Sequence, residues 1–288
     1  MKKQFKSGLI VGLLLLKVIA IRTPLWGAQS QNDVRLVVSL EASQLGLHEP
    51  IYAVFSIENH LSETLDVDLG LDNLRIRRMA TFAFSITDPD GIFLQIPPFP
   101  TYPDGNFGNP ARVTIKPGST YELRLLLNEW YEFRSIGDYR VGVKTDAVFR
   151  TESGRSVLPS TANIIVARVG PRNENRLTRI CNDLAKLAET SDLAGQVEAI
   201  QALSYVRDPV AVPYMKLLFE NGRLINFFLY PIVQALGRIG STDAIDALIA
   251  NLPTKDADLR SMIVSELRKL ESSTTDAKLK AQIQNALR

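Results

Sequence analysis

The side chains that could support acid–base or metal chemistry are few and scattered. His48 and His60 are the only histidines in the 288 residues, and both fall at expected loops or strand ends. A zinc site usually needs at least three well-placed protein ligands, and neither histidine has a partner at a suitable spacing. A Ser-His-Asp hydrolase would require one of these histidines, and the sequence has no G-x-S-x-G motif. We therefore expect ordinary surface or turn histidines, with no metal and no cofactor.

The carboxylates and the single thiol support the same expectation. Asp66 and Asp68 share one face of an expected strand because alternate residues of a strand point the same way. Such a pair could bind Ca²⁺ or act as acid and base, but we favour the solvated face of an edge strand. Asp88–Gly91 (DPDG) is explained by turn chemistry alone. Cys181 is the only cysteine, which excludes an internal disulfide and favours buried packing. We expect a protein that is not an enzyme.

A stiff aromatic segment is the most suggestive loop. Residues 97–108 (PPFPTYPDGNFG) combine four prolines with Phe99, Tyr102 and Phe107. Proline lowers the entropy lost on binding, and exposed aromatic side chains are good anchors. This loop could therefore bind a partner peptide or a sugar ring. The alternative is that it folds over the end of a domain with its aromatic side chains inside.

Any such site must be positioned by the surrounding elements, and the clearest of these form a repeat. Residues 201–219 and 234–252 align with an offset of 234 − 201 = 33 residues. Gln201, Ala202 and Leu203 align with Gln234–Leu236, and apolar positions match through the rest of the stretch. A fixed period of about 20–50 residues is typical of stacked repeat arrays.

Each copy is expected to contain two helices separated by a capped turn. Asp208 and Ser241 are candidate N-caps, and Pro209 suits the first position of a helix because proline lacks only an unpaired N–H there. Pro231 departs from the pattern, since a proline inside a helix removes a hydrogen bond. We expect it in the first turn or at a kink.

Apolar stripes flank the two copies at helical spacing. Their members are Leu177, Ile180, Leu184 and Leu187; Leu259, Ile263, Leu267 and Leu270; and Leu279, Ile283 and Leu287. A helix pair cannot bury such a stripe alone, so neighbouring pairs must stack. The last helix, expected over 276–287, is polar on its other face, as suits a cap.

The second copy carries a resemblance to a known family. Residues 235–240 (ALGRIG), followed by STDAIDALIANL, resemble bacterial HEAT repeats of the kind found in phycobilisome-lyase-like proteins. The resemblance extends over about 176–288. It implies a short α-helical solenoid that binds other macromolecules and says little about any activity.

A polar stripe marks a candidate binding surface on this array. Asn226, Tyr230, Gln234 and Arg238 recur every four residues, opposite an apolar stripe. If this helix lies in the row that lines a concave surface, these residues form a groove together with Gln201 and Tyr205 of the first copy. The alternative is a solvated helix face.

The first thirty residues have the features of a secretory signal peptide. Lys2, Lys3 and Lys6 precede the apolar run Leu9–Leu16, and Ala28–Ser30 offers a small-x-small cleavage site. Lys17 interrupts the apolar stretch, which leaves an uncleaved signal-anchor as the alternative, and only then would the chain contact a membrane. We expect an exported bacterial protein, periplasmic or secreted.

From residue 31 to 168 the hydrophobic period changes to two. The expected strands are 34–40, 51–57, 65–69, 82–86, 92–96, 121–127, 139–143 and 164–166. Several short strands with turn signals between them predict an immunoglobulin-like β-sandwich. Trp130–Phe133 follows a strand directly and is expected to pack in the core or at the domain junction.

Four phrases in this half resemble a bacterial immunoglobulin-like domain named after an intracellular proteinase inhibitor. They are Gly46–Ile51 (GLHEPI), Ser56–Asn59 (SIEN), Lys116–Gly118 (KPG) and Gly137–Val141 (GDYRV). The resemblance covers about 33–168 and implies the fold. Protease inhibition stays an alternative only, because no inhibitory loop matches residue by residue.

The predicted organisation is a signal peptide (1–30), a β-sandwich (31–168), a linker (169–175) and helical repeats (176–288). Hydrophobic residues make up 45% of the chain, enough for a core in each domain, and the net charge of +2 gives no reason to expect nucleic acid. We expect a non-catalytic protein–protein interaction module. The alternative is a cell-surface carbohydrate-binding module that uses the aromatic loop.

Overall fold

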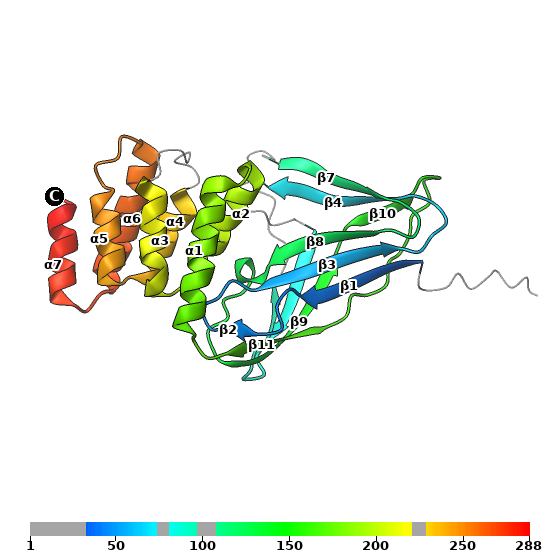
Figure 1. Cartoon of the computed structure of the whole chain (residues 1–288), viewed down its shortest axis with the longest axis horizontal. Helices are drawn as coiled ribbons and strands as arrows, with labels where there is room; N and C mark the ends of the chain where they lie inside the picture. Colours follow the sequence, from blue (N-terminus) through cyan, green and yellow to red (C-terminus); the bar gives the residue numbers. More distant parts are fainter. Residues whose placement is uncertain (1–32, 74–80, 97–107, 221–228) are drawn as a thin grey trace, which may run out of the picture.

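A computed structural model describes residues 33–73, 81–96, 108–220 and 229–288. Figure 1 shows a β-rich N-terminal half beside a helical C-terminal half, as predicted. The predicted signal peptide and the side chains of Phe99, Tyr102, Phe107 and Asn226 lie outside the described residues. Within the described ranges, no helix has the length and apolar character needed to cross a bilayer.

The β-rich half consists of sheets whose strands alternate buried and solvent-facing residues. The first sheet contains β1 (Val34–Leu40), β3 (Tyr52–Asn59) and β8 (Thr120–Leu126), in that order. The second contains β10 (Val148–Thr151), β4 (Leu65–Asn73) and β7 (Gly108–Ile115). The third contains β2 (Leu45–Gly46), β11 (Ile165–Gly170), β9 (Gly137–Thr145), β5 (Phe82–Thr87) and β6 (Phe93–Ile96). Neighbouring strands are antiparallel except β2 and β11.

One buried cluster draws residues from all three sheets. Phe55 meets Phe82 edge to face at 4.9 Å, and Phe84 lies 4.5 Å from Trp130 between ring centroids. Trp130 and Phe133 are buried, which confirms that this segment packs in the core. All eight expected strands are present. The strands β2, β7 and β10 were not predicted, because two are very short and β7 begins with Gly-Asn-Pro.

Asn59 ties three segments of the first two sheets together. Its side chain is completely buried and donates to the carbonyls of Glu63 (3.0 Å) and Ile115 (2.9 Å). Its Oδ1 accepts from the N–H of Leu61 at 3.0 Å. The buried amide thus provides hydrogen-bond partners for backbone groups of a turn that lies outside the regular strand pairing.

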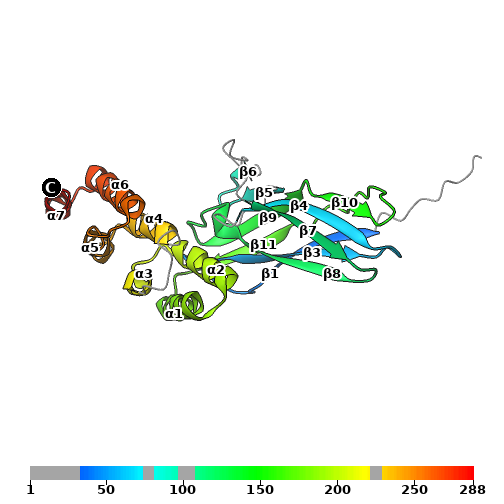
Figure 2. The same ribbon diagram turned by 90° about the horizontal axis from the view of Figure 1, so that it is seen from above.

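The helices lie in two rows, which Figure 2 shows from above. One row contains α2 (Leu193–Ser204), α4 (Tyr230–Ile239) and α6 (Ala257–Ser273). The other contains α1 (Glu174–Thr190), α3 (Val212–Glu220), α5 (Thr242–Ala250) and α7 (Ala277–Ala286). Each helix contacts the next member of its own row, and one core runs through the array.

The predicted helix boundaries are largely confirmed. Asp208 caps the short 3₁₀ helix η2 (Pro209–Ala211), and Ser241 caps α5 through the N–H of Ala244. Pro231 lies in the first turn of α4, where its missing N–H costs no helical hydrogen bond.

The predicted stripe on α1 is correct at Leu177, which is buried, and at Leu184, which packs against the core, but it is wrong at Leu187. Leu187 is 49% exposed, and the buried face consists of Leu177, Cys181, Ala185 and Ala188. Small residues let α1 approach its neighbours closely, so the alanines face the core although leucines were available nearby. Cys181 is buried as expected, and burial raises the pKa of its thiol to about 12, which keeps the thiol protonated.

We predict that Asn59→Ala lowers the free energy of unfolding by about 3 kcal/mol, because it leaves buried backbone groups without partners. Chemical denaturation followed by tryptophan fluorescence measures this change. Ser62→Ala, on the exposed part of the same turn, is the control and changes stability by less than about 0.5 kcal/mol. Equal effects of the two variants would contradict the role given to Asn59.

Candidate functional site

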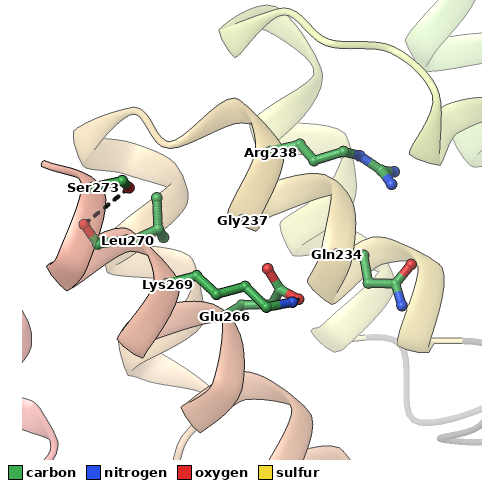
Figure 3. Close-up of a pocket in the computed structure, with 7 residues that line it drawn as sticks. All are labelled: Gln234, Gly237, Arg238, Glu266, Lys269, Leu270 and Ser273. Atoms are coloured by element: carbon green, nitrogen blue, oxygen red, sulfur yellow. Dashed lines mark hydrogen bonds and ion pairs between the residues drawn. The ribbon is translucent and has the colours of Figure 1, made fainter. Parts of the chain in front are cut away.

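A hollow between α4 and α6 is the strongest candidate binding surface of the helical array. It has a volume of about 410 Å³ and is lined by Gln234, Gly237, Arg238, Glu266, Lys269, Leu270 and Ser273. We call it the α4–α6 hollow (Figure 3). Two of the residues expected from the sequence, Gln234 and Arg238, contribute to it, and the exposed Gln234 offers both hydrogen-bond donors and acceptors.

Gly237 makes room for the neighbouring helix. A Cβ at this position would lie 2.5 Å from Oε2 of Glu266 and 3.2 Å from its Cβ. The glycine therefore lets α6 pack close to α4 while the surrounding side chains remain at the surface. The first glycine of the ALGRIG run therefore shapes this surface, and no sequence pattern had assigned it to the site.

The charged groups of the α4–α6 hollow are held by defined contacts. Lys269 Nζ donates to Glu266 Oε1 at 2.7 Å, and the lysine side chain is 67% exposed. Arg238 reaches back toward α2, where it donates to the carbonyl of Ser204 at 2.9 Å. Its guanidinium lies 5.6 Å from the centroid of the Tyr205 ring. The hollow thus presents hydrogen-bond donors, a carboxylate and an amide. These described groups do not form a catalytic arrangement.

The remaining predicted residues do not join this hollow. Gln201 is only 9% exposed and lines a second hollow, between α2 and β8. Tyr205 lines a small third hollow of about 80 Å³ together with His48 and Arg207. Tyr230 is half-buried at the start of α4. The structure therefore differs from the single continuous groove that we expected, because α2 ends the row and faces the β-rich half.

The second hollow, which we call the β8–α2 hollow, has a volume of about 240 Å³. Its lining includes Tyr52, Arg124, Trp130, Glu198 and Gln201. The Arg124 guanidinium lies 3.5 Å from the centroid of the Tyr52 ring and bonds to Glu41 at 2.8 Å. Arg124 also pairs with Glu198 of α2. No sequence pattern predicted this hollow, because its residues come from distant segments of the chain.

Ion pairs of arginine with carboxylates join the two halves of the chain. Arg176 of α1 bonds to Glu49 at 2.9 Å and to the carbonyl of Gln44 at 2.6 Å. Arg207 pairs with Glu132 at the other end of the junction. Burial raises the pKa of Glu49, while a backbone N–H at Gly46 and the charge of Arg176 act in the opposite direction. The ion pair with Arg176 thus offsets part of the effect of burial on this carboxylate.

A further pair secures the start of the array. Arg172 bonds to both carboxylate oxygens of Asp208, at 2.5 and 3.0 Å, and Asp208 also accepts from the N–H of Val210 at 3.0 Å. These contacts, above all that with Arg172, lower the pKa of Asp208 below its ordinary value. Asp208, which the sequence predicts as an N-cap, therefore also binds the segment that connects the β-rich half to α1.

The other candidates for chemistry have local partners. Asp66 is exposed and accepts from Thr114 Oγ1 at 2.7 Å, while Asp68 lies 3.6 Å from Arg112. His60 Nε2 lies 3.1 Å from Glu58 Oε2. His48 has a positive φ of 71° in the turn before β3. Across the described ranges, no group of three or more His, Cys, Asp or Glu residues could hold a metal ion.

Comparison with known proteins supports the helical repeat. The family of PBS lyase HEAT-like repeats matches residues 232–252, which span most of α4 and all of α5. No curated protein sequence matches the chain. The match thus identifies a HEAT-like repeat in this segment, and such repeats generally mediate protein interactions.

Solved structures with similar parts are only distantly related. A structural-genomics target, SoR45, is 14% identical and covers 48% of this chain and 88% of its own, with a TM-score of 0.30. The bacterial hydrophobin BslA is 13% identical over 49% of this chain and 97% of its own, with a TM-score of 0.23. A β-glucosidase from Listeria innocua is 14% identical over 48% of this chain and 16% of its own, with a TM-score of 0.24. At these scores the similarities carry no functional argument.

We predict that Gly237→Ala destabilises the helical array, although alanine normally favours a helix over glycine by about 1 kcal/mol. The added Cβ meets Glu266, and overpacking of this kind costs about 1–3 kcal/mol. Thermal unfolding followed by circular dichroism measures the loss. In a Glu266→Ala background the cost should nearly vanish, because most of the colliding side chain is gone. The same cost in both backgrounds would contradict this packing.

We also predict that Asp208→Ala costs about 2 kcal/mol at pH 7, through loss of the cap and of the bonds to Arg172. Because the folded-state pKa of Asp208 is lowered, its stabilising effect is present above the ordinary aspartate pKa and is lost as the pH falls through the folded value. The difference between wild type and variant should therefore shrink between pH 7 and pH 2 in urea denaturation. Asp183→Ala, exposed on α1, is the control. A difference that stays constant with pH would contradict the assignment.

Proposed function

We propose that the protein is an exported, non-catalytic scaffold that binds a partner protein through the α4–α6 hollow. The observation that carries the proposal is that polar side chains of two helices line one hollow beside Gly237, which lies in the matched repeat. Repeat arrays of this kind commonly use such extended surfaces for binding. The proposal includes a short helical solenoid, of which the described helices form two rows.

In the same proposal the β-rich half is an immunoglobulin-like sandwich that holds the array rigidly. Support comes from Tyr139, near the start of β9, whose hydroxyl donates to the carbonyl of Ser135 at 3.0 Å and accepts from its N–H at 3.0 Å. A tyrosine that bonds back to the backbone a few residues upstream is a hallmark of immunoglobulin-like domains. The junction ion pairs then fix the array relative to this support.

Export is the third part of the proposal, and residues 1–30 support it. A basic start, an apolar run and a small-x-small site occur in the order that a signal peptide requires. An exported scaffold would meet its partner outside the cytoplasm, so the exported fraction of the source cells is the place to search.

The proposal is tested with two baits that differ only in the α4–α6 hollow. The first bait is the wild-type chain, and the second carries Gln234→Glu and Arg238→Glu, which change the charge by three units. We expect at least one exported protein to be retained by the wild type and reduced tenfold or more by the variant. Quantitative mass spectrometry measures both, and purified partner then gives dissociation constants for each bait.

A matched control separates a local effect from a general charge effect. Lys280→Glu with Asn285→Glu, both exposed on α7, makes the same change of three units away from the hollow. This variant should retain the partner as the wild type does. A partner that all three baits retain equally would move binding elsewhere, and retention of none would remove the scaffold proposal.

A further inference from the structure

Among the described residues, β3 is the only strand that pairs with β8, so β8 forms an edge of its sheet. The N–H of Leu127 donates to the carbonyl of Ile51 at 2.8 Å, and the N–H of Asn59 donates to the carbonyl of Ser119 at 3.0 Å. In an antiparallel strand, alternate residues direct their backbone N–H and carbonyl groups toward the same neighbouring side. The backbone groups that face away from β3 therefore belong to Thr120, Glu122, Arg124 and Leu126.

The opposite edge of the same sheet, along β1, is covered by side chains that bond to its backbone, in contrast to the edge along β8. Ser160 Oγ accepts from the N–H of Leu36 at 3.1 Å, and Asn163 bonds to both the N–H and the carbonyl of Val38, at 2.7 and 2.8 Å. These side chains occupy the outer edge of β1. No such bond covers the outer edge of β8 within the described residues. An unpaired edge is a template for another strand.

The β8–α2 hollow lies beside this edge and contains polar groups that lack partners. It is lined by consecutive residues of β8, from Leu123 to Leu126, and by α2. The side chain of Gln201 is about nine-tenths buried and forms no hydrogen bond with described residues. The hydroxyl of Tyr52 is buried and also has no hydrogen-bond partner. Buried polar groups normally have partners, so the Tyr52 hydroxyl points to a ligand, to which Gln201 of the lining offers a second contact.

The charge around the hollow favours a cation. Glu129 and Glu198 line it, and Glu41 binds the same guanidinium as Glu198. Of the described residues that line the hollow, Arg124 is the only basic one. Burial, with the charges of these three carboxylates, raises the pKa of Tyr52 despite the nearby Arg124, so its hydroxyl remains a neutral donor and acceptor. Leucines and Trp130 offer apolar contact for an aliphatic stem.

We propose that the edge of β8 binds an extended segment of a partner protein as an added strand, with a lysine or arginine of that segment in the β8–α2 hollow. The backbone of the segment pairs with the outward groups of Glu122 and Arg124. Its basic side chain reaches the amide oxygen of Gln201 and the hydroxyl of Tyr52. This is the mode in which backbone bonds give affinity and a pocket beside the edge gives specificity. The site is separate from the α4–α6 hollow.

The test uses two capped peptides of five residues, in which valine alternates with lysine or with glutamate. We expect the lysine peptide to bind the full-length protein at least tenfold more tightly than the glutamate peptide in fluorescence anisotropy. Hydrogen exchange of the protein, followed by mass spectrometry, should show slower exchange in the proteolytic fragment that contains β8 when the lysine peptide is bound. Equal binding of the two peptides, no binding of either, or no protection of β8 would overturn the proposal.

Two pairs of variants separate strand addition from a general charge effect. Glu122→Pro removes one outward N–H without breaking the ladder to β3 and should weaken the lysine peptide at least tenfold. Glu122→Ala keeps that N–H and should change binding less than threefold. Gln201→Leu should also weaken binding tenfold, whereas Lys280→Glu with Asn285→Glu, exposed on α7, should leave it unchanged.

Folding and self-association are checked with the same samples. Circular dichroism establishes that each variant is folded, and Gln201→Leu remains informative if Glu122→Pro does not fold. Sedimentation of the wild type reports its oligomeric state. A dimer that Glu122→Pro dissociates would show that a second copy occupies β8, and this would also overturn the proposal.

Discussion

Ion pairs between arginine and carboxylates hold the two halves of this chain together, and the arrangement of its surfaces depends on them. Glu49 is almost completely buried, and its charge is compensated by Arg176 of α1. A buried carboxylate that loses its partner is strongly unfavourable, so the contact strongly favours one placement of α1 on the turn before β3. Arg207 and Arg124 add contacts at other points of the junction. Several anchored points restrict rotation where a single contact would act as a hinge.

This placement creates surfaces that neither half would have alone. The β8–α2 hollow combines the edge of a sheet with one helix, while the α4–α6 hollow lies farther along the array. The first presents unpaired backbone groups and excess negative charge, and the second presents polar side chains of both kinds. The two surfaces therefore suit different features of a partner, such as an extended basic segment at the junction and a folded surface on the array.

Glycine has a specific role at one of these surfaces. Gly237 allows α6 to pack against α4 with Glu266 in place, whereas a Cβ at this position would force the Glu266 side chain to move. Close packing brings Gln234, Glu266 and Lys269 together at the surface. A position chosen for packing thus also shapes the candidate binding site, which links stability and binding in this part of the array.

Local sequence patterns were enough to predict the order of the two halves, the eight expected strands and the capped helices. These features depend on local spacing and capping chemistry, as at Ser241 and Pro231, and such signals do not require knowledge of distant contacts. The exposure of Leu187 on α1 was missed because the choice between leucines and alanines on one helix depends on how closely its neighbours approach.

Which candidate residues share a surface depends on how the helices and sheets pack in three dimensions. Gln234 and Arg238 lie together, but Gln201 faces β8 because α2 packs against the β-rich half. Arg124 and Glu198 are far apart in sequence and meet only when the junction forms. Helical spacing predicts the face on which a residue lies, whereas the element that covers this face is set by long-range packing, which no local pattern encodes.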